Sequence, residues 1–255
     1  MAIKTTPEIA EMVENKPIIC FKDVAIAFQT NVALFDVNLD IFQNDLFGIC
    51  GPNGSGKSTL LKAIVGSVEP FRGHVKVFRK DISKGNIRHI KSKIGYLPQK
   101  ENIDRNFPAL VRDVVGMGLF SQVGFFKKLS KEDNDKIHQA LEIVEMENLD
   151  MRPIGHLSGG QQQKAMIARG IVNNPEILLM DEPFSALDFK VEQSIMHLIK
   201  KIHDETNVTI VMITHSINFI KQYCNRAACL DRRIIWSGNP KEHDFDDVIK
   251  RVFFH

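Results

Sequence analysis

The chain has 255 residues, of which 44% are apolar and 25% charged, so it can bury a full core and has the composition of a globular protein. Lysine and arginine exceed aspartate and glutamate by only two, so the overall charge predicts no nucleic-acid partner. No apolar run approaches the roughly 18 residues of a membrane helix, and four scattered cysteines do not make a disulfide framework. These features exclude a membrane-spanning chain and a disulfide scaffold, and they predict a protein of the reducing cytosol.

The first elements expected along the chain are strands. Sixteen mostly polar residues at the start (1–16) predict a loosely held N-terminal arm. Residues 18–41 then alternate apolar and polar side chains, as half-buried strands do, and predict an antiparallel sheet. Further strands are expected at 73–78 and 94–99, and the stretch 81–93 between them is compatible with a helix.

Nine lysines and arginines lie between residues 72 and 100, where Asp81 is the one acid. A basic run of this kind is usually a solvated face. It could instead contact anionic lipid or an acidic partner, and the sequence leaves both interpretations open.

Helix signals replace β-branched runs from about residue 100 to residue 156. Ser130 can cap a helix together with Asp133, in a variant of the capping box. Ile137, Leu141 and Val144 then form an apolar stripe at helical spacing. The pattern predicts a helical subdomain, at about 100–160, inserted into an α/β core.

The second half of the chain returns to α/β patterns. A glycine-rich start at 157–161 opens the next helix, and short continuous apolar runs at 177–180 and 208–213 predict strands that are covered on both faces. An amphipathic helix is expected between these strands. A hairpin around residues 231–233 and a short amphipathic tail (241–255) are expected at the end.

One stretch carries the chemistry: the sequence GPNGSGKST at residues 51–59, which follows an apolar strand and leads into a helix. Glycines let the backbone turn tightly, and the N–H groups and the helix N-terminus then favour a phosphate group. Lys57 can reach the β- and γ-phosphates, and the hydroxyl of Ser58 can ligate Mg²⁺. The residues predicted to bind nucleotide in this loop are Gly51, Pro52, Asn53, Gly54, Ser55, Gly56, Lys57, Ser58 and Thr59.

Two acids end the apolar run at 177–180. A carboxylate at the tip of a strand beside a phosphate loop suits a magnesium partner, and we assign this role to Asp181. Glu182, the next residue, can act as the general base that activates the attacking water.

The ordered motifs resemble those of ATP-binding cassette (ABC) proteins, over residues 18 to about 238. The motifs that carry the resemblance are the phosphate loop, the signature LSGGQ at Leu157–Gln161, the Q-loop glutamine Gln99, the D-loop at Ser185–Asp188, the switch histidine His215, and Phe28 in the place of the aromatic that stacks on adenine. The resemblance implies an α/β fold of the P-loop NTPase class: an ABC ATPase core with a RecA-like mixed sheet, an antiparallel β subdomain and an inserted helical subdomain. The ATP-binding domain would span residues 17–240.

The resemblance also implies a mechanism. ATP with Mg²⁺ would bind between two copies of the chain, paired head to tail, because one chain contains one phosphate loop and one signature. His215 would contact the γ-phosphate, and Gln99 would couple the site to a partner. The remaining residues implied to bind nucleotide are Ser158, Gly159, Gly160, Gln161 and Asp188, and those implied to hold the metal are Ser58, Gln99 and Asp181.

Within the family, residues 94–99, 111–118 and 124–133 look like the ATPases of manganese-, zinc- and iron-type importers. We therefore expect an ATPase on the inner face of the cell membrane that powers metal import through separate permease subunits, served indirectly by an extracytoplasmic substrate-binding protein. Two alternatives remain: the ATPase of an iron-chelate, haem or cobalamin importer, and a soluble ABC ATPase of iron–sulfur assembly.

Overall fold

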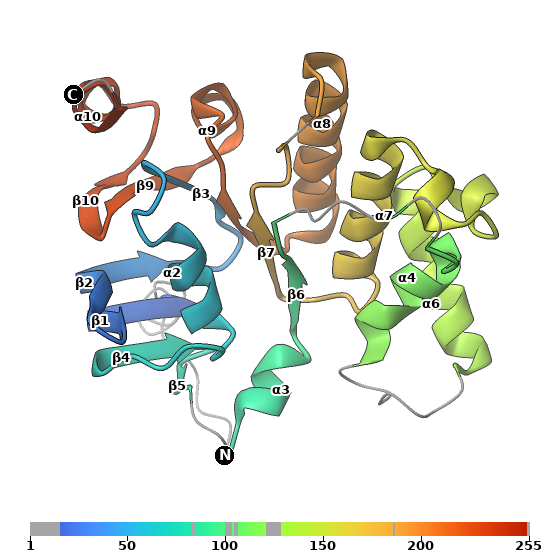
Figure 1. The fold of residues 1–255 in the computed structure, drawn as a ribbon, viewed down its shortest axis with the longest axis horizontal. Helices are drawn as coiled ribbons and strands as arrows, with labels where there is room; N and C mark the ends of the chain where they lie inside the picture. Colours follow the sequence, from blue (N-terminus) through green and yellow to red (C-terminus); the bar gives the residue numbers. More distant parts are fainter. Residues whose placement is uncertain are drawn as a thin grey trace, which may run out of the picture.

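The computed structural model describes residues 16–82, 85–99, 104, 107–120, 129–185 and 187–253. Its strands form two sheets, and a group of helices lies beside them as a separate lobe (Figure 1). The predicted arm up to residue 15, the stretch 124–128, Ala186 and the last two residues lie outside the described residues.

The smaller sheet is antiparallel, in the order β2-β1-β4-β5, as expected for residues 18–41 and 73–78. Its strands are β1 (Ile19–Phe28), β2 (Asn31–Ile41), β4 (Arg72–Val77) and β5 (Lys80–Asp81). Phe78 and Arg79 connect β4 to β5 with φ angles of 52° and 64°, the left-handed conformation of a two-residue hairpin turn.

The stretch 81–93, which the sequence made compatible with a helix, is not helical at its start. Asp81 pairs with Lys76 in the sheet, and the helix α3 covers only Ile87–Lys91. The charged side chains of the 81–93 stretch suit an exposed strand as well as a helix, so the pattern did not distinguish the two.

The larger sheet is mixed, in the order β10-β9-β3-β8-β7-β6. All neighbouring pairs are parallel except the hairpin of β9 with β10. Its strands are β3 (Leu46–Cys50), β6 (Ile94–Leu97), β7 (Ile177–Asp181), β8 (Thr209–Ile213), β9 (Arg226–Asp231) and β10 (Arg233–Gly238).

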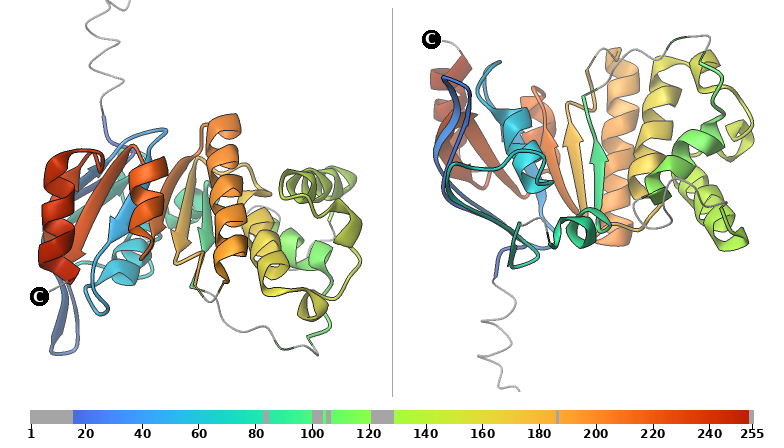
Figure 2. Two further views of the ribbon diagram at one scale, coloured as in Figure 1. Left: turned by 90° about the horizontal axis from the view of Figure 1, so that it is seen from above. Right: turned by 60° about the horizontal axis from the view of Figure 1, so that its bottom comes forward.

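Helices cover both faces of the mixed sheet, which explains why its central strands are continuously apolar (Figure 2). Leu178 and Met180 face one core with α8, α9 and α10, whereas Ile177 and Leu179 face the other with α2 and the antiparallel sheet. The helices of this part are α2 (Lys57–Ile64), α8 (Phe189–Thr206), α9 (Ile217–Tyr223) and α10 (His243–Phe253).

The predicted helical subdomain contains α4 and α6, and α7, the helix expected after the glycine-rich start at 157–161, packs against both. Ser130 and Asp133 form the expected capping box at the start of α6, with the Ser130 amide donating to the Asp133 carboxylate at 2.8 Å. The apolar stripe of α6 is buried. The elements are α4 (Val111–Gly116), α6 (Lys131–Ile143), α7 (Gly159–Ile171) and the short 3₁₀ turns η1 (Met117–Leu119), η2 (Glu147–Leu149) and η3 (Ile154–His156).

The tail that follows β10 is a docked helix. In α10 Phe245 is fully buried, and its ring lies 4.8 Å from that of Trp236, centroid to centroid. The indole N–H of Trp236 donates to Asp244 at 2.7 Å. The domain limits at residues 16 and 240 remain predictions. Among the described residues no helix has the length and apolarity to cross a membrane.

Candidate functional site

The phosphate loop follows β3 and enters α2 directly, in the expected strand–loop–helix order. Gly51 has φ 151°, and a Cβ there would lie 2.0 Å from the carbonyl oxygen of Leu230 in β9. Gly56 has φ 95°, and a Cβ there would lie 2.6 Å from the carbonyl oxygen of Ala33 in β2. No side chain fits at either end, so both glycines are required for the loop to seat between the two sheets.

The side chain of Lys57 is buried inside the loop. Its Nζ donates to the carbonyl oxygens of Gly51 at 2.9 Å and Pro52 at 2.8 Å. Burial lowers the pKa of this ammonium, and the nearby carboxylates of Glu182 and Asp181 act in the opposite direction. The ammonium group of Lys57 therefore lies at the centre of the loop, enclosed by backbone.

The rest of the loop divides into an exposed rim and a buried base. Asn53 and Gly54 are exposed, Pro52 is half-buried, and Ser58 and Thr59 lie in the first turn of α2. The hydroxyl of Ser55 is buried with no hydrogen-bond partner among the described residues.

Asp181 lies at the end of β7, beside the start of α2. Its carboxyl is buried and hydrogen-bonded to Ser58, but Oδ1 has no hydrogen-bond partner in the described part of the chain. Burial raises its pKa, an effect that the Ser58 hydrogen bond partly offsets. A buried carboxylate oxygen without a partner next to a hydroxyl is a donor set that suits a hard divalent cation such as Mg²⁺.

The three residues predicted to be catalytic, Gln99, Glu182 and His215, meet at the carboxylate of Glu182. Glu182 accepts a hydrogen bond from Nε2 of Gln99 at its Oε2 and another from Nε2 of His215 at its Oε1, both at 2.9 Å. Glu182 itself has φ 51°, a conformation that costs free energy in any residue but glycine. Its amide donates to the carbonyl of Ile213, which anchors this strained turn to β8.

The signature residues open α7. The amide of Gln161 donates to Oγ of Ser158 at 3.3 Å, and the amide of Ser158 donates to Oε1 of Gln161 at 3.0 Å, a reciprocal capping box. A Cβ at Gly160 would lie 2.5 Å from Cγ1 of Val191, so this glycine lets α7 approach α8. Gly159 is the first residue of α7.

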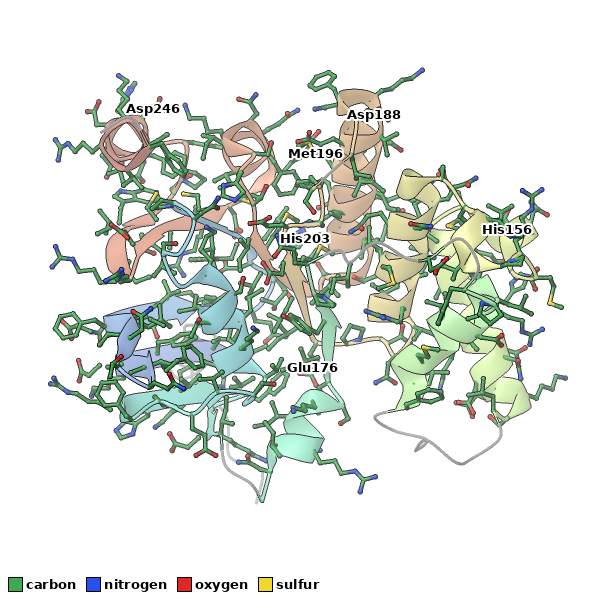
Figure 3. The ribbon with its side chains drawn as sticks, in the orientation of Figure 1. His156, Glu176, Asp188, Met196, His203 and Asp246 are labelled. Carbon is green, nitrogen blue, oxygen red and sulfur yellow. The ribbon has the colours of Figure 1, made fainter. Side chains whose placement is uncertain are left out.

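Asp188 lies at the start of α8 and caps it, with Oδ1 accepting from the amide of Val191 at 3.0 Å (Figure 3). Val191 therefore connects the D-loop aspartate to the signature glycine. Phe28 lies at the turn from β1 to β2, where it is 48% exposed, and β2 in turn reaches the phosphate loop through Ala33.

The predicted residues form two separate groups. The phosphate loop, Gln99, Asp181, Glu182 and His215 follow or end strands of the mixed sheet at its carboxyl edge. The signature lies at the start of α7, and β6 and β7 lie between α2 and α7 in every view (Figures 1 and 2). In one copy the predicted phosphate-loop residues and the predicted signature residues therefore lie apart, on opposite sides of β6 and β7.

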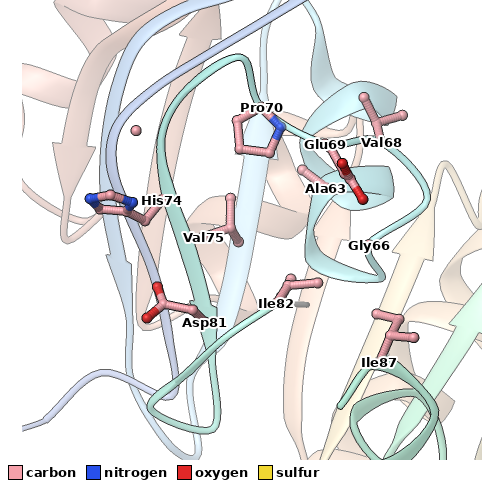
Figure 4. Close-up of a pocket in the computed structure, with 11 residues that line it drawn as sticks. Ala63, Gly66, Val68, Glu69, Pro70, His74, Val75, Asp81, Ile82 and Ile87 are labelled. Carbon is pink, nitrogen blue, oxygen red and sulfur yellow. The ribbon is translucent and has the colours of Figure 1, made fainter. Parts of the chain in front are cut away.

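Sequence reasoning missed Lys62 and Tyr96, which line a cavity of about 600 Å³ together with Ser58, Gln99 and Asp181. The signal was present for Lys62, because it lies four residues after Ser58 on the same helix face. A separate cavity of about 280 Å³ lies among α2, β4 and α3, and none of the predicted site residues lines it (Figure 4).

A pair of buried thiols was also missed. Sγ of Cys50, which precedes the phosphate loop, lies 2.9 Å from Sγ of Cys229 in the neighbouring strand β9. This hydrogen bond, together with burial, raises the pKa of Cys50 far above its ordinary range. The two cysteines are 179 positions apart, so only the strand order brings them together.

Comparison with known proteins identifies the family of the chain. Residues 34–185 match the family model described as ABC transporter. The chain is 36% identical to the manganese transport system ATP-binding protein MntB of Halalkalibacterium halodurans, over 87% of this chain and 86% of that protein. It is also 36% identical to the high-affinity zinc uptake system ATP-binding protein ZnuC of Bacillus subtilis, over 84% and 91% of the two chains.

Among solved structures, the fold is similar to that of the dimeric ATP-binding cassette MJ0796 in a post-hydrolysis state with ADP and Pi. The TM-score is 0.73 at 30% identity, over 88% of this chain and 99% of that one. The matching family model, the relatives and the shared architecture lead to one conclusion: the chain belongs to the ABC transporter family, as an ATP-binding and ATP-hydrolysing cassette.

Proposed function

We propose that this chain is the ATPase subunit of an importer for a divalent metal ion of the manganese, zinc or iron type. The observation that carries the proposal is the 36% identity, over most of both chains, to ATP-binding proteins of a manganese transport system and of a zinc uptake system. The metal would pass through separate permease subunits and would not touch this chain. The cassette would then lie peripherally on the inner face of the cell membrane.

We assign the catalytic roles from the family resemblance, and the contacts around the phosphate loop support them. Lys57 and the N-terminal amides of α2 would bind the β- and γ-phosphates, and Phe28 would stack on adenine. Ser58, Gln99 and Asp181 would hold Mg²⁺, since the buried free oxygen of Asp181 suits it. Bound there, Mg²⁺ supplies positive charge that offsets the charge of the phosphate oxygens.

Glu182 would take the proton of the attacking water. Its two carboxylate oxygens are held by Gln99 and His215, so the base has a defined orientation before a substrate arrives. His215 would also contact the γ-phosphate, and Gln99, which follows β6, would report the state of the site to a partner subunit.

The complete site requires a second copy of the chain. Ser158, Gly159, Gly160 and Gln161 form the N-terminus of a 13-residue helix, where backbone amides favour a γ-phosphate. Because β6 and β7 separate this helix from the phosphate loop of the same copy, we propose a head-to-tail pair in which each signature faces the partner's loop. Asp188, beside the signature, would lie at that interface.

The test is a pull-down of the tagged chain from detergent-solubilised native membranes, followed by mass spectrometry. Recovery of a polytopic permease together with a metal-binding extracytoplasmic protein supports metal import. Uptake of manganese, zinc and iron is then measured in cells that carry the wild type or Glu182→Gln, with the amount of protein as the control. Transport of chelated iron or cobalamin alone would favour the chelate importer, and recovery of only soluble partners would contradict a transport role.

A further inference from the structure

The turn between β9 and β10 lies against the phosphate loop. The carbonyl oxygen of Leu230, near the end of β9, is the atom that a Cβ at Gly51 would meet. Arg232 is the residue between the two strands, and its backbone forms two hydrogen bonds outside the hairpin. Its amide donates to the carbonyl oxygen of Ser55 at 2.8 Å, and its carbonyl oxygen accepts from the amide of Phe35 in β2 at 2.7 Å. The turn therefore connects the phosphate loop with β2.

The backbone of Arg232 is strained. Its φ is 56°, a left-handed conformation that costs free energy in any residue but glycine. The side chain is exposed, so its packing does not explain this conformation. The two backbone hydrogen bonds are therefore the contacts that hold Arg232 in place.

The hydrogen bond to Ser55 fixes the next peptide unit of the loop. The bond between Ser55 and Gly56 is trans, since the described residues contain no cis peptide bond. A trans peptide is planar, and its C=O and N–H groups point in opposite directions. Because the Ser55 carbonyl points to Arg232, the N–H of Gly56 points away from the turn.

The Gly56 amide is open to a ligand. Gly56 is the N-cap of α2, and its amide forms no hydrogen bond with another residue that the structure describes. Amides at the start of a helix favour an anionic oxygen, and Nζ of Lys57 adds positive charge within the same loop. A phosphate oxygen of a nucleotide is thus a fitting acceptor for this amide.

We infer that Arg232 is a positioning residue of the nucleotide site: its amide holds the Ser55 carbonyl outward, which aims the N–H of Gly56 at a phosphate oxygen of the bound nucleotide. A released carbonyl would be free to rotate toward the phosphate, and the loop would then present an oxygen where a donor is needed. The inference rests on the proposed binding of nucleotide at the phosphate loop. It assigns the role to the backbone of Arg232 and none to its charge.

The test compares substitutions that keep or remove this amide. Arg232→Gly keeps it and adopts a φ of 56° without strain, whereas Arg232→Pro has no N–H and requires a φ of about −65°. Arg79→Pro is the matched control, because Arg79 has φ 64° in the turn between β4 and β5. In the wild type with Mg²⁺ and ADP, the amide proton of Gly56 shifts downfield as it forms a charge-assisted hydrogen bond. This shift persists in Arg232→Gly and Arg79→Pro and is lost in Arg232→Pro.

Steady-state ATP hydrolysis separates positioning from a general structural defect. A hydrogen bond that is present in both the ground state and the transition state affects KM and leaves kcat unchanged. The KM for ATP rises about tenfold or more in Arg232→Pro, with kcat within about threefold of the wild type, and the other two variants keep both constants. An equal rise in Arg232→Gly would assign the effect to the charge of the side chain. An unchanged KM in Arg232→Pro would overturn the inference.

A full-length chain assembled by ligation at Cys229 serves if Arg232→Pro does not fold. Its synthetic segment, residues 229–255, carries Arg232→Ala in one version and lactic acid at the same position in the other. Lactic acid replaces the amide by an ester, so the two versions differ in the N–H group alone. The difference in KM and in the Gly56 shift appears between them, and equal values would refute the role of the amide. Failure of the wild type itself to bind ADP would instead refute the proposed nucleotide site.

Discussion

Replacing Glu182 by glutamine removes the charge of the proposed base but keeps its shape. In the native site two donors, Gln99 and His215, approach the carboxylate at 2.9 Å. A glutamine at position 182 accepts one of these bonds at its oxygen. The other is retained if His215 carries its proton on Nδ1 or if the amide of Gln99 turns over, because both groups can then accept. The substitution therefore leaves no cavity and little strain beyond the native φ of 51°.

What is lost is proton transfer. General base catalysis contributes about 10²–10⁴ in rate, which corresponds to about 3–5 kcal/mol of barrier. We expect Glu182→Gln to lower ATP turnover by that factor while the affinity for ATP and the melting temperature stay close to those of the wild type. Because ATP then persists, the variant should elute as a dimer in ATP and Mg²⁺ on size-exclusion chromatography.

The assay is steady-state phosphate release at saturating ATP, with fluorescent-nucleotide titration and thermal melting on the same preparations. Glu192→Gln is the matched control, because Glu192 in the first turn of α8 lines a cavity of about 290 Å³ together with Glu182 and His215. The control keeps its turnover. If Glu182→Gln hydrolyses ATP within about threefold of the wild type, its assignment as the base is wrong. If it stays monomeric with ATP and Mg²⁺, the head-to-tail pair is wrong.

Three further predictions concern the phosphate loop, the thiol of Cys20 and the helix α10. Gly51→Ala should abolish ATP binding, because the new Cβ would lie 2.0 Å from the carbonyl oxygen of Leu230. A Cβ at Gly54 would meet no atom within 4 Å, so Gly54→Ala should cost only about 1–2 kcal/mol of backbone strain. Nucleotide titration of both variants checks this, and equal affinities would contradict it. The pKa of Cys20 is raised to about 11, chiefly by burial, so at pH 8 its thiolate fraction is about a hundredfold below that of an ordinary thiol. A thiol reagent should accordingly modify Cys20 slowly until the chain is unfolded by denaturant, and rapid native labelling would show that the side chain is open. Phe245→Ala should lower the free energy of unfolding by about 3–5 kcal/mol in urea, since the ring is fully buried; a loss below about 1 kcal/mol would mean that α10 is not docked.

Much of the fold could be predicted from local patterns. The capping box of Ser130 with Asp133 involves neighbours in the chain, so the sequence alone was sufficient to predict it. The continuous apolar run at 177–180 predicted a strand covered on both faces, and the order of strand, loop and helix predicted the phosphate loop at residues 51–59.

The sequence pattern did not predict the structure where an exposed strand and an exposed helix require the same kind of residues. The charged stretch after Lys80 could be an exposed strand or an exposed helix, and hairpin pairing of β5 with β4 decided in favour of the strand. The tail after residue 240 read as a short amphipathic segment, and its burial against Trp236 is a matter of packing between distant surfaces.

The candidate site also has a part that the sequence predicts and a part that only the tertiary structure shows. The sequence by itself predicted which residues carry the chemistry, because the phosphate loop, the strand-end acids and the signature are each contiguous and have a local physical meaning. Only the tertiary structure decided that Gln99 and His215 meet at the carboxylate of Glu182, across 83 and 33 positions of chain. It also decided that Cys50 lies against Cys229 and that Lys62 and Tyr96 line one cavity together with Asp181. These contacts depend on the strand order β9-β3-β8-β7-β6, which is set by the packing of the whole core and not by any one segment.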